Sequence, residues 1–202
     1  MAKKSGLLIA IGLLLIAAAL CLTSYNLYSS TKAGNAGAAA AERLAERISS
    51  VPAELGGEEF PDYVLNPEMD MPITEIDGHK YIGLLSIPSL SLELPVMSTW
   101  DYSLLNIAPC RYTGSVYLND MVIAAHNYST HFGRLNELSP GASVTFTDSD
   151  GNVFSYSVIE IETLSAYAVD EMVGGDWDLT LFTCTIGGAQ RVTVRCIRLP
   201  DA

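Results

Sequence analysis

The stretch from Leu179 to Arg195 is LTLFTCTIGGAQRVTVR, and its pattern predicts a β-hairpin. Residues that favour strands alternate on both sides of a turn at Gly187 and Gly188, where glycine permits the positive φ angles of a tight turn. Cys184 ends the first predicted strand, and Arg191 begins the second. The hairpin therefore brings a thiol and a guanidinium to the same end of a sheet, where loops commonly carry reactive groups.

The chain before this hairpin is also rich in short predicted strands. Turn signals such as Asp77-Gly78 and Pro140-Gly141 separate alternating or apolar segments. Together with the hairpin they give about eight strands after Ile73, which predicts an all-β fold with a closed or nearly closed barrel. Near-helical spacing predicts one or two short helices, within residues 100–111 and 131–138. The clearest predicted strands before the hairpin are 81–87, 90–96, 121–125, 143–147 and 152–164.

A nearly uninterrupted apolar run extends from Leu7 to Leu22, directly after Lys3 and Lys4. With its neighbours the run approaches the ~17–25 residues that cross a bilayer as a helix. The two lysines predict that the N-terminus lies in the cytoplasm. A cleaved signal peptide is an alternative, and so is a lipid on Cys21, although the preceding leucine is large for a lipid-attachment site. All three interpretations place the rest of the chain outside the membrane.

The segment Thr-Leu-Phe-Thr-Cys that ends at Cys184, followed after a short loop by Arg191, resembles a signature of the sortases. These are cysteine transpeptidases of Gram-positive cell surfaces, and their signature is Thr-Leu-x-Thr-Cys followed by Arg. Ala124-Ala125-His126 is similar to the Ala-Gly-His of the same family, with Ala125 in place of the glycine. The resemblance covers roughly residues 81–199 and implies an eight-stranded β-barrel, in agreement with the strand pattern.

The same resemblance identifies Cys184 as the nucleophile and His126 as its acid–base partner. A thiol attacks a carbonyl as the thiolate, which a neighbouring cationic group favours. His126 follows an apolar strand whose end could lie beside Cys184. His131, in a polar loop, and His79, beside the Asp77-Gly78 turn, are the alternative histidines.

Arg191 is the expected catalytic arginine. Alternation places Arg191, Thr193 and Arg195 on one face, so Arg195 is an alternative, but Arg191 is nearer the turn. The resemblance implies that this arginine holds substrate and opposes the negative charge of an oxyanion. Thr183 and the backbone beside Cys184 are expected to donate hydrogen bonds to the substrate.

The resemblance implies an enzyme that cleaves a Leu-Pro-x-Thr-Gly-like sorting motif on surface proteins. An amine of a peptidoglycan precursor or a pilin subunit then resolves the acyl-enzyme. Neither a cofactor nor a metal is expected, because the histidines and cysteines lack zinc-site spacing. A secreted cysteine peptidase and a non-enzymatic surface β-domain that binds a partner are the alternatives. The expected location is the cell membrane, with a single span and an extracellular catalytic domain.

Three regions are expected along the chain. Residues 1–30 form a cytoplasmic tip and transmembrane anchor, residues 31–72 a linker, and residues 73–202 the sortase-like catalytic domain. Small residues over 31–41 predict flexibility, with a short helix possible over 38–48. A linker segment that covers the active site is an alternative, because Phe60-Pro61-Asp62-Tyr63 loosely resembles the lid of some pilus-building sortases.

Charge and cysteine content bear on nucleic-acid binding and on disulfide bonds. The formal net charge is −12, and no basic patch indicates nucleic-acid binding. Three cysteines follow the apolar run, so at least one thiol is free or pairs with another chain. A Cys110–Cys196 disulfide is conceivable, whereas Cys196 also fits a buried strand position beside Val192 and Val194.

Overall fold

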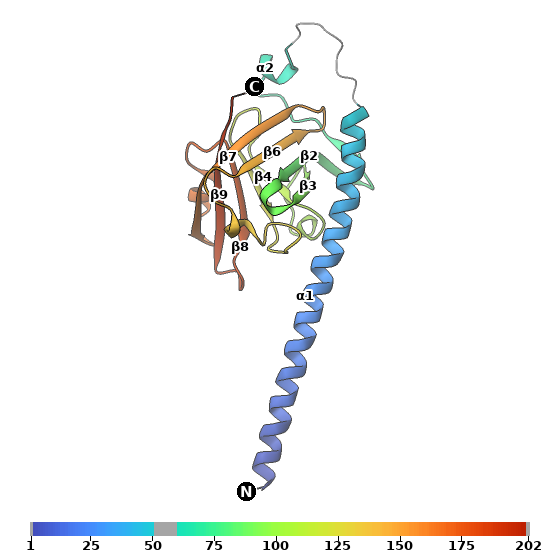
Figure 1. The fold of residues 1–202 in the computed structure, drawn as a ribbon, viewed down its shortest axis with the longest axis vertical. Coiled ribbons are helices and arrows are strands. Elements are labelled where there is room, and N and C mark those ends of the chain that lie inside the picture. Colours follow the sequence, from blue (N-terminus) through green and yellow to red (C-terminus); the bar gives the residue numbers. More distant parts are fainter. Residues whose placement is uncertain (1, 51–59, 201–202) are drawn as a thin grey trace.

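The computed structural model describes residues 2–50 and 60–200 of the chain. One long helix, α1 (Ala2–Ser50), passes along one side of a β-barrel and extends far beyond it toward the N-terminus (Figure 1). The strands are β1 (Thr74–Ile76), β2 (His79–Ile87), β3 (Leu92–Met97), β4 (Cys110–Thr113), β5 (Met121–Ala125), β6 (Ser143–Asp148), β7 (Val153–Ser165), β8 (Leu179–Cys184) and β9 (Gln190–Arg198). The short helices are α2 (Asp62–Leu65), α3 (Val169–Val173) and the 3₁₀ turns η1 (Pro88–Leu90), η2 (Leu104–Asn106) and η3 (Leu135–Glu137).

Eight of the nine strands close into a ring. Their order is β2-β3-β4-β5-β8-β9-β7-β6, and β6 pairs with β2 to complete the circuit, while β1 is an added edge strand beside β2. Gly83 lies where β2 pairs with both β3 and β6. A Cβ at this position would lie 2.1 Å from the carbonyl oxygen of Thr147, so closure requires a glycine here. The predicted eight-stranded barrel is confirmed.

The main apolar core fills the barrel. Alternate residues of β6 are buried, and the same alternation in the first half of β7 places Phe154, Tyr156 and Val158 inside. Phe146 and Phe154 are fully buried, and each such side chain stabilises the fold by roughly 1.5–3 kcal/mol. The period-2 pattern that predicted these strands therefore marks the side of each strand that faces the barrel interior.

A second apolar cluster lies between α1 and the outer surface of the barrel. Ala40, Ala41 and Leu44 of α1 are buried there, and Leu44 is fully buried. Their partners include Tyr81, Met97, Val122 and Phe182, which come from β2, β3, β5 and β8. Helix α1 is therefore part of the packed structure as well as a candidate anchor.

The expected flexibility of residues 31–41 is wrong, because these residues continue α1. Ala33, Gly37, Ala40, Ala41 and Leu44 are all buried, and their spacing follows one face of a helix. Small side chains let the helix approach the barrel closely, so glycine and alanine here mark a contact surface. Residues 51–59, the middle of the expected linker, lie outside the described residues.

The possible lid segment packs at the end of the barrel opposite Cys184. The ring of Tyr63 stacks on Tyr117, with centroids 4.7 Å apart and an interplanar angle of 6°, and lies 5.3 Å from Phe154. Phe154 is also next to Arg198, at the far end of β9 from Arg191. Seven residues of strand separate those ends, about 23 Å. Residues 60–63 therefore do not cover the cysteine.

The N-terminal part of α1 is long and apolar enough to cross a membrane. An 18-residue window within Gly6–Ser50 has a mean hydropathy of 2.7, and none of that window is buried against the rest of the protein. Its leucines and isoleucines point outward, for example Leu8 and Leu14, which are 69% and 71% exposed. This arrangement leaves an apolar cylinder free to contact lipid.

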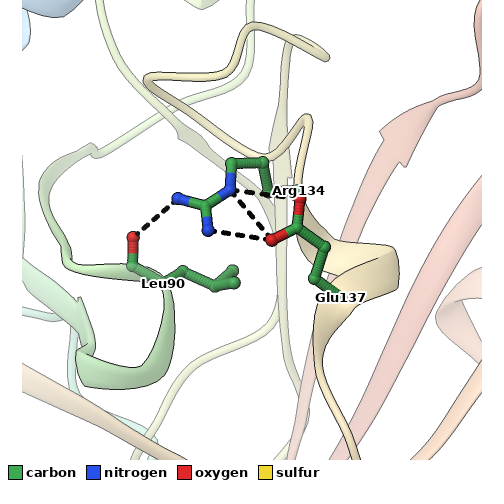
Figure 2. Close-up of polar contacts among 3 residues, drawn as sticks. All are labelled: Leu90, Arg134 and Glu137. Atoms are coloured by element: carbon green, nitrogen blue, oxygen red, sulfur yellow. Dashed lines mark hydrogen bonds and ion pairs between the residues drawn. The ribbon is translucent and has the colours of Figure 1, made fainter.

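The two predicted helices of the domain are single 3₁₀ turns, η2 and η3, and α3 is a further short helix between β7 and β8. At η3 the Arg134 guanidinium donates to the Glu137 carboxylate at 2.8 Å and to the Leu90 carbonyl at 3.2 Å (Figure 2). The exposed ion pair itself adds little stability. The bond to Leu90 connects η3 to η1 and fixes the end of the loop that follows β5.

Candidate active site

Cys184 and Arg191 are direct partners across the β8–β9 ladder. Opposite residues of antiparallel strands share a face, and their Cβ atoms are ~4.5–5.5 Å apart. Phe182 and Thr193 form the next pair on this face, and Phe182 packs in the outer cluster. Cys184 and Arg191 therefore project from the outer surface of the barrel, and both are partly exposed.

His126 follows directly from β5, the other neighbour of β8. The two strands are parallel, and their last paired residues are Ala125 and Thr183. The residues that follow this pair are His126 and Cys184, so both lie at the same level of the sheet. No hydrogen bond joins the imidazole to the thiol among the described residues. Catalytic hydrogen bonds in proteins without substrate are often long and shorten only when substrate binds.

Aromatic rings enclose the imidazole of His126. The Tyr102 ring lies edge-on at 5.6 Å, and the Tyr128 ring lies at 5.0 Å. Burial lowers the pKa of His126 below its ordinary value of 6.5, because the charged form loses hydration. The neutral imidazole therefore predominates at neutral pH and can accept a proton.

The side chain of Arg191 is held over the hairpin turn. Its Nη1 donates to the carbonyl oxygens of Gly188 at 2.9 Å and Gln190 at 3.0 Å. Gly187 and Gly188 adopt φ angles of 85° and 75°, the left-handed region that the sequence predicted for this turn. The turn thus keeps a permanent cation beside Cys184.

Arg195, the alternative arginine, is 2% exposed and lies further along β9. It donates to the Glu162 carboxylate at 2.7 Å, to Thr180 Oγ1 at 3.0 Å and to the Met172 carbonyl at 2.9 Å. A further bond reaches the carbonyl of Glu171. These bonds fasten α3 to the barrel, a structural role that no signal in the sequence indicated.

Thr183 is buried, and its hydroxyl donates to the Ala125 carbonyl at 2.8 Å. The expected hydrogen bond from this side chain to substrate would therefore compete with an existing one. The observed bond instead links β8 to β5 immediately before Cys184 and His126.

The other histidines and the other cysteines of the barrel differ from His126 and Cys184 in burial or in their place in the fold. His131 is fully buried and His79 is in the β1–β2 turn region. Cys110 and Cys196 are free, and burial raises the pKa of each to about 12. Cys196 belongs to the barrel interior and Cys110 to the outer cluster, so they are on opposite sides of the sheet and form no disulfide.

These features define a closed β-barrel with a partly exposed cysteine between a histidine and an arginine at one end of its strands. The Sortase domain family model matches residues 85–198, and the chain belongs to the sortase family. It is 32% identical over 116 residues to Sortase A of Bacillus anthracis. That alignment spans 54% of this chain and 54% of the relative, about half the length of each.

Solved structures share the fold at lower sequence identity. A Clostridium perfringens Sortase D5 transpeptidase has a TM-score of 0.56 and 18% identity, with 78% of this chain and 94% of that chain covered. Streptococcus pneumoniae Sortase C has a TM-score of 0.54 and 22% identity, with 81% and 90% covered. Because these alignments cover 78% and 81% of this chain, the similarity of fold extends over the barrel as a whole.

Proposed function

We propose that this chain is a cysteine transpeptidase that cleaves a sorting motif and joins the acyl product to an amine. The observation that carries the proposal is the placement of Cys184 between two strand neighbours. Arg191 is its cross-strand partner on β9, and His126 follows β5 at the same level of the sheet. A nucleophile, an acid–base group and a fixed cation are the parts that acyl transfer requires.

In the acylation step, the Cys184 sulfur bonds to a backbone carbonyl carbon of the motif. The carbonyl electron pair moves to oxygen, and the Arg191 cation opposes the resulting negative charge. His126, neutral because of its lowered pKa, takes the thiol proton. It returns that proton to the leaving amine as the carbon–nitrogen bond breaks, which yields a thioester.

In the second step, an incoming amine attacks the thioester carbon. His126 receives a proton from the attacking nitrogen, and the carbon–sulfur bond breaks to restore the Cys184 thiol. Water can replace the amine in the same geometry, and the product would then be a free acid. Transpeptidase and peptidase therefore differ in the nucleophile that reaches the acyl-enzyme.

The proposed substrate is a Leu-Pro-x-Thr-Gly-like motif on surface proteins. The proposed nucleophile is an amine of a peptidoglycan precursor or a pilin subunit. Family membership supports this substrate class. The description of the Streptococcus pneumoniae Sortase C structure refers to pilin substrate specificity in that protein.

Mass spectrometry of the full-length protein in detergent tests the activity. The protein is incubated with sorting-motif peptides and with triglycine or a lysine-containing peptide as the amine. We expect a thioester adduct on Cys184 and a ligated product whose yield rises with amine concentration. Release of the free acid alone, at a rate independent of amine, would support the peptidase alternative. The absence of any adduct would support the alternative of a non-enzymatic surface β-domain that binds a partner.

We further propose that the first part of α1 spans the cell membrane and that the barrel lies outside. The outward-facing apolar residues of α1 and the preceding Lys3 and Lys4 support this orientation. Protease added to intact cells should remove the barrel and leave a short membrane-bound fragment. Recovery of the intact chain from the cytosolic fraction alone would contradict this topology.

A further inference from the structure

The loop that carries His126 is fixed at both of its ends. We call residues 126–134 the histidine loop. It begins at the end of β5, and the amide of Phe132 returns a hydrogen bond to the His126 carbonyl at 3.2 Å. Its far end is held by the bond of Arg134 to Leu90 (Figure 2). In the middle of the loop, the described residues include one side-chain bond to the barrel domain, from the Tyr128 hydroxyl to Asn106 Oδ1 at 3.3 Å.

Helix α1 contacts this middle part. The Thr130 hydroxyl donates to the Ser30 carbonyl at 3.2 Å. The helix has a glycine beside this bond, and a Cβ on Gly34 would lie 2.8 Å from Cγ2 of Thr130. One turn further on, a Cβ on Gly37 would lie 3.3 Å from the Ile107 carbonyl oxygen. Both glycines therefore permit a contact that larger residues would push apart.

His131 indicates that the helix holds the loop in place. Its side chain is fully buried, and both ring nitrogens lack hydrogen-bond partners within the described residues. The hypothetical Cβ of Gly37 would lie 3.8 Å from its Nε2, so α1 forms part of the enclosure. An unpaired imidazole is more stable in water than in such a site. Packing against α1 must therefore oppose the tendency of His131 to turn toward solvent.

A movement of this part of the loop would reach His126 through Tyr128. The Tyr128 ring lies 5.0 Å from the His126 ring on one side and 5.6 Å from the His131 ring on the other. Its hydroxyl donates to Asn106 Oδ1 at 3.3 Å, next to the segment that Gly37 contacts. The three rings form a continuous series of tilted contacts from the enclosure beside α1 to the candidate catalytic histidine.

We propose that residues 30–37 of α1 are a positioning element of the active site, which holds His126 in place beside Cys184 by docking on the histidine loop. The role of His126 in this statement rests on the proposed function. The docking contact is the new element, and it assigns to the anchor helix a part in catalysis beyond attachment to the membrane.

Gly34→Leu in the full-length chain tests the proposal. Leucine favours a helix more than glycine does, so α1 itself should not be weakened. The new side chain should displace Thr130 and release the histidine loop. The matched control is Ala36→Leu, because Ala36 is exposed on the same helix. Thr130→Val removes the hydrogen bond to Ser30 from the other side of the contact and nearly preserves shape.

Three readouts are compared in detergent. We expect faster hydrogen exchange over residues 126–134 in Gly34→Leu, with the barrel strands unchanged. The pKa of His126, followed by NMR of its ring, should rise toward 6.5 as the ring becomes hydrated. Transpeptidation should fall about 10- to 100-fold, since a displacement of ~1 Å can cost two orders of magnitude. Thr130→Val should change all three in the same direction but less.

Unchanged hydrogen exchange and an unchanged His126 titration in Gly34→Leu would overturn the proposal, as would equal changes in Ala36→Leu. If Gly34→Leu does not fold, Gly34→Ala and Thr130→Val provide the same comparison with smaller perturbations. If the unmodified protein has no transpeptidase activity, the proposed function fails, and exchange and titration still decide whether α1 positions the loop.

Discussion

Thr183 donates its hydroxyl to the backbone carbonyl of Ala125 at 2.8 Å, one residue before Cys184 on one strand and one residue before His126 on the other. The bond is buried and joins two parallel strands at the point where both end. The geometry of the candidate catalytic pair therefore depends on a residue whose side chain points away from the substrate face.

We expect Thr183→Val to lower stability by roughly 0.5–1.5 kcal/mol, the usual value of one intramolecular hydrogen bond. Activity should fall further than stability alone explains, because the ends of β5 and β8 lose their connection. Thr183→Ser is the control, since it keeps the hydroxyl. Thermal unfolding and the transpeptidation rate are measured for both variants. Equal activity in the valine and serine variants would exclude a role for this bond in the site.

Cys184→Ala should abolish adduct formation while the unfolding temperature remains within a degree or so of the unmodified protein. Cys184 is partly exposed at a strand end, so its sulfur contributes little packing. Cys196→Ala should leave adduct formation intact and lower stability, because Cys196 is fully buried in the barrel. Adduct mass and thermal unfolding distinguish the two. A covalent adduct on the Cys184→Ala protein would show that another group is the nucleophile.

The two arginines on β9 should respond differently to replacement by lysine. Arg191→Lys should reduce turnover strongly with little loss of stability, because lysine keeps the charge but lacks the planar guanidinium, whose Nη1 bonds Gly188 and Gln190. Arg195→Lys should mainly reduce stability, since lysine cannot make all the bonds that the buried guanidinium makes to Glu162, Thr180 and the carbonyls of α3. Measurement of kcat and unfolding temperature for both lysine variants checks these two expectations. A larger effect of Arg195→Lys on kcat, at temperatures where it is folded, would contradict the assignment.

His131 should make the protein less stable in acid. Burial, and to a smaller extent the nearby His126, lowers the pKa of His131 to about 4. The unfolded chain, with a pKa near 6.5, binds protons that the folded state excludes, so stability rises with pH over this interval. The contribution of neutral His131 to the free energy of unfolding is complete above about pH 6.5. It is lost as the pH falls toward 4, and the loss is on the order of 3 kcal/mol.

We expect His131→Phe to reduce this pH dependence, while His126, whose pKa is lowered in the same direction, contributes to the slope that remains. Thermal unfolding between pH 4 and 8 checks the prediction, and His79→Phe is the control because that histidine is in the β1–β2 turn region. An identical pH profile for the His131→Phe and unmodified proteins would show that the buried imidazole does not titrate with unfolding.

The sequence alone determined the features that depend on local order. The glycine pair, the alternation around it and the positions of Cys184 and Arg191 predicted the β8–β9 hairpin, because a strand has a period of two residues and a tight turn requires particular backbone angles. The barrel was predictable for the same reason, since each strand shows which of its residues face inward. His126 was predicted as a candidate from its place after an apolar strand and from its resemblance to a family motif.

Only the tertiary structure decided which groups those residues contact. The small residues of α1 looked flexible in the sequence, yet Gly34 and Gly37 allow the helix to approach Thr130 and Ile107 closely. Arg195 has the same side-chain chemistry as Arg191, but its depth in the fold gives it partners in α3 and β7. Contacts between segments distant in the chain leave no periodic signal, because a small or polar residue does not specify its partner. The position of α1 beside the histidine loop is therefore a property of the folded molecule.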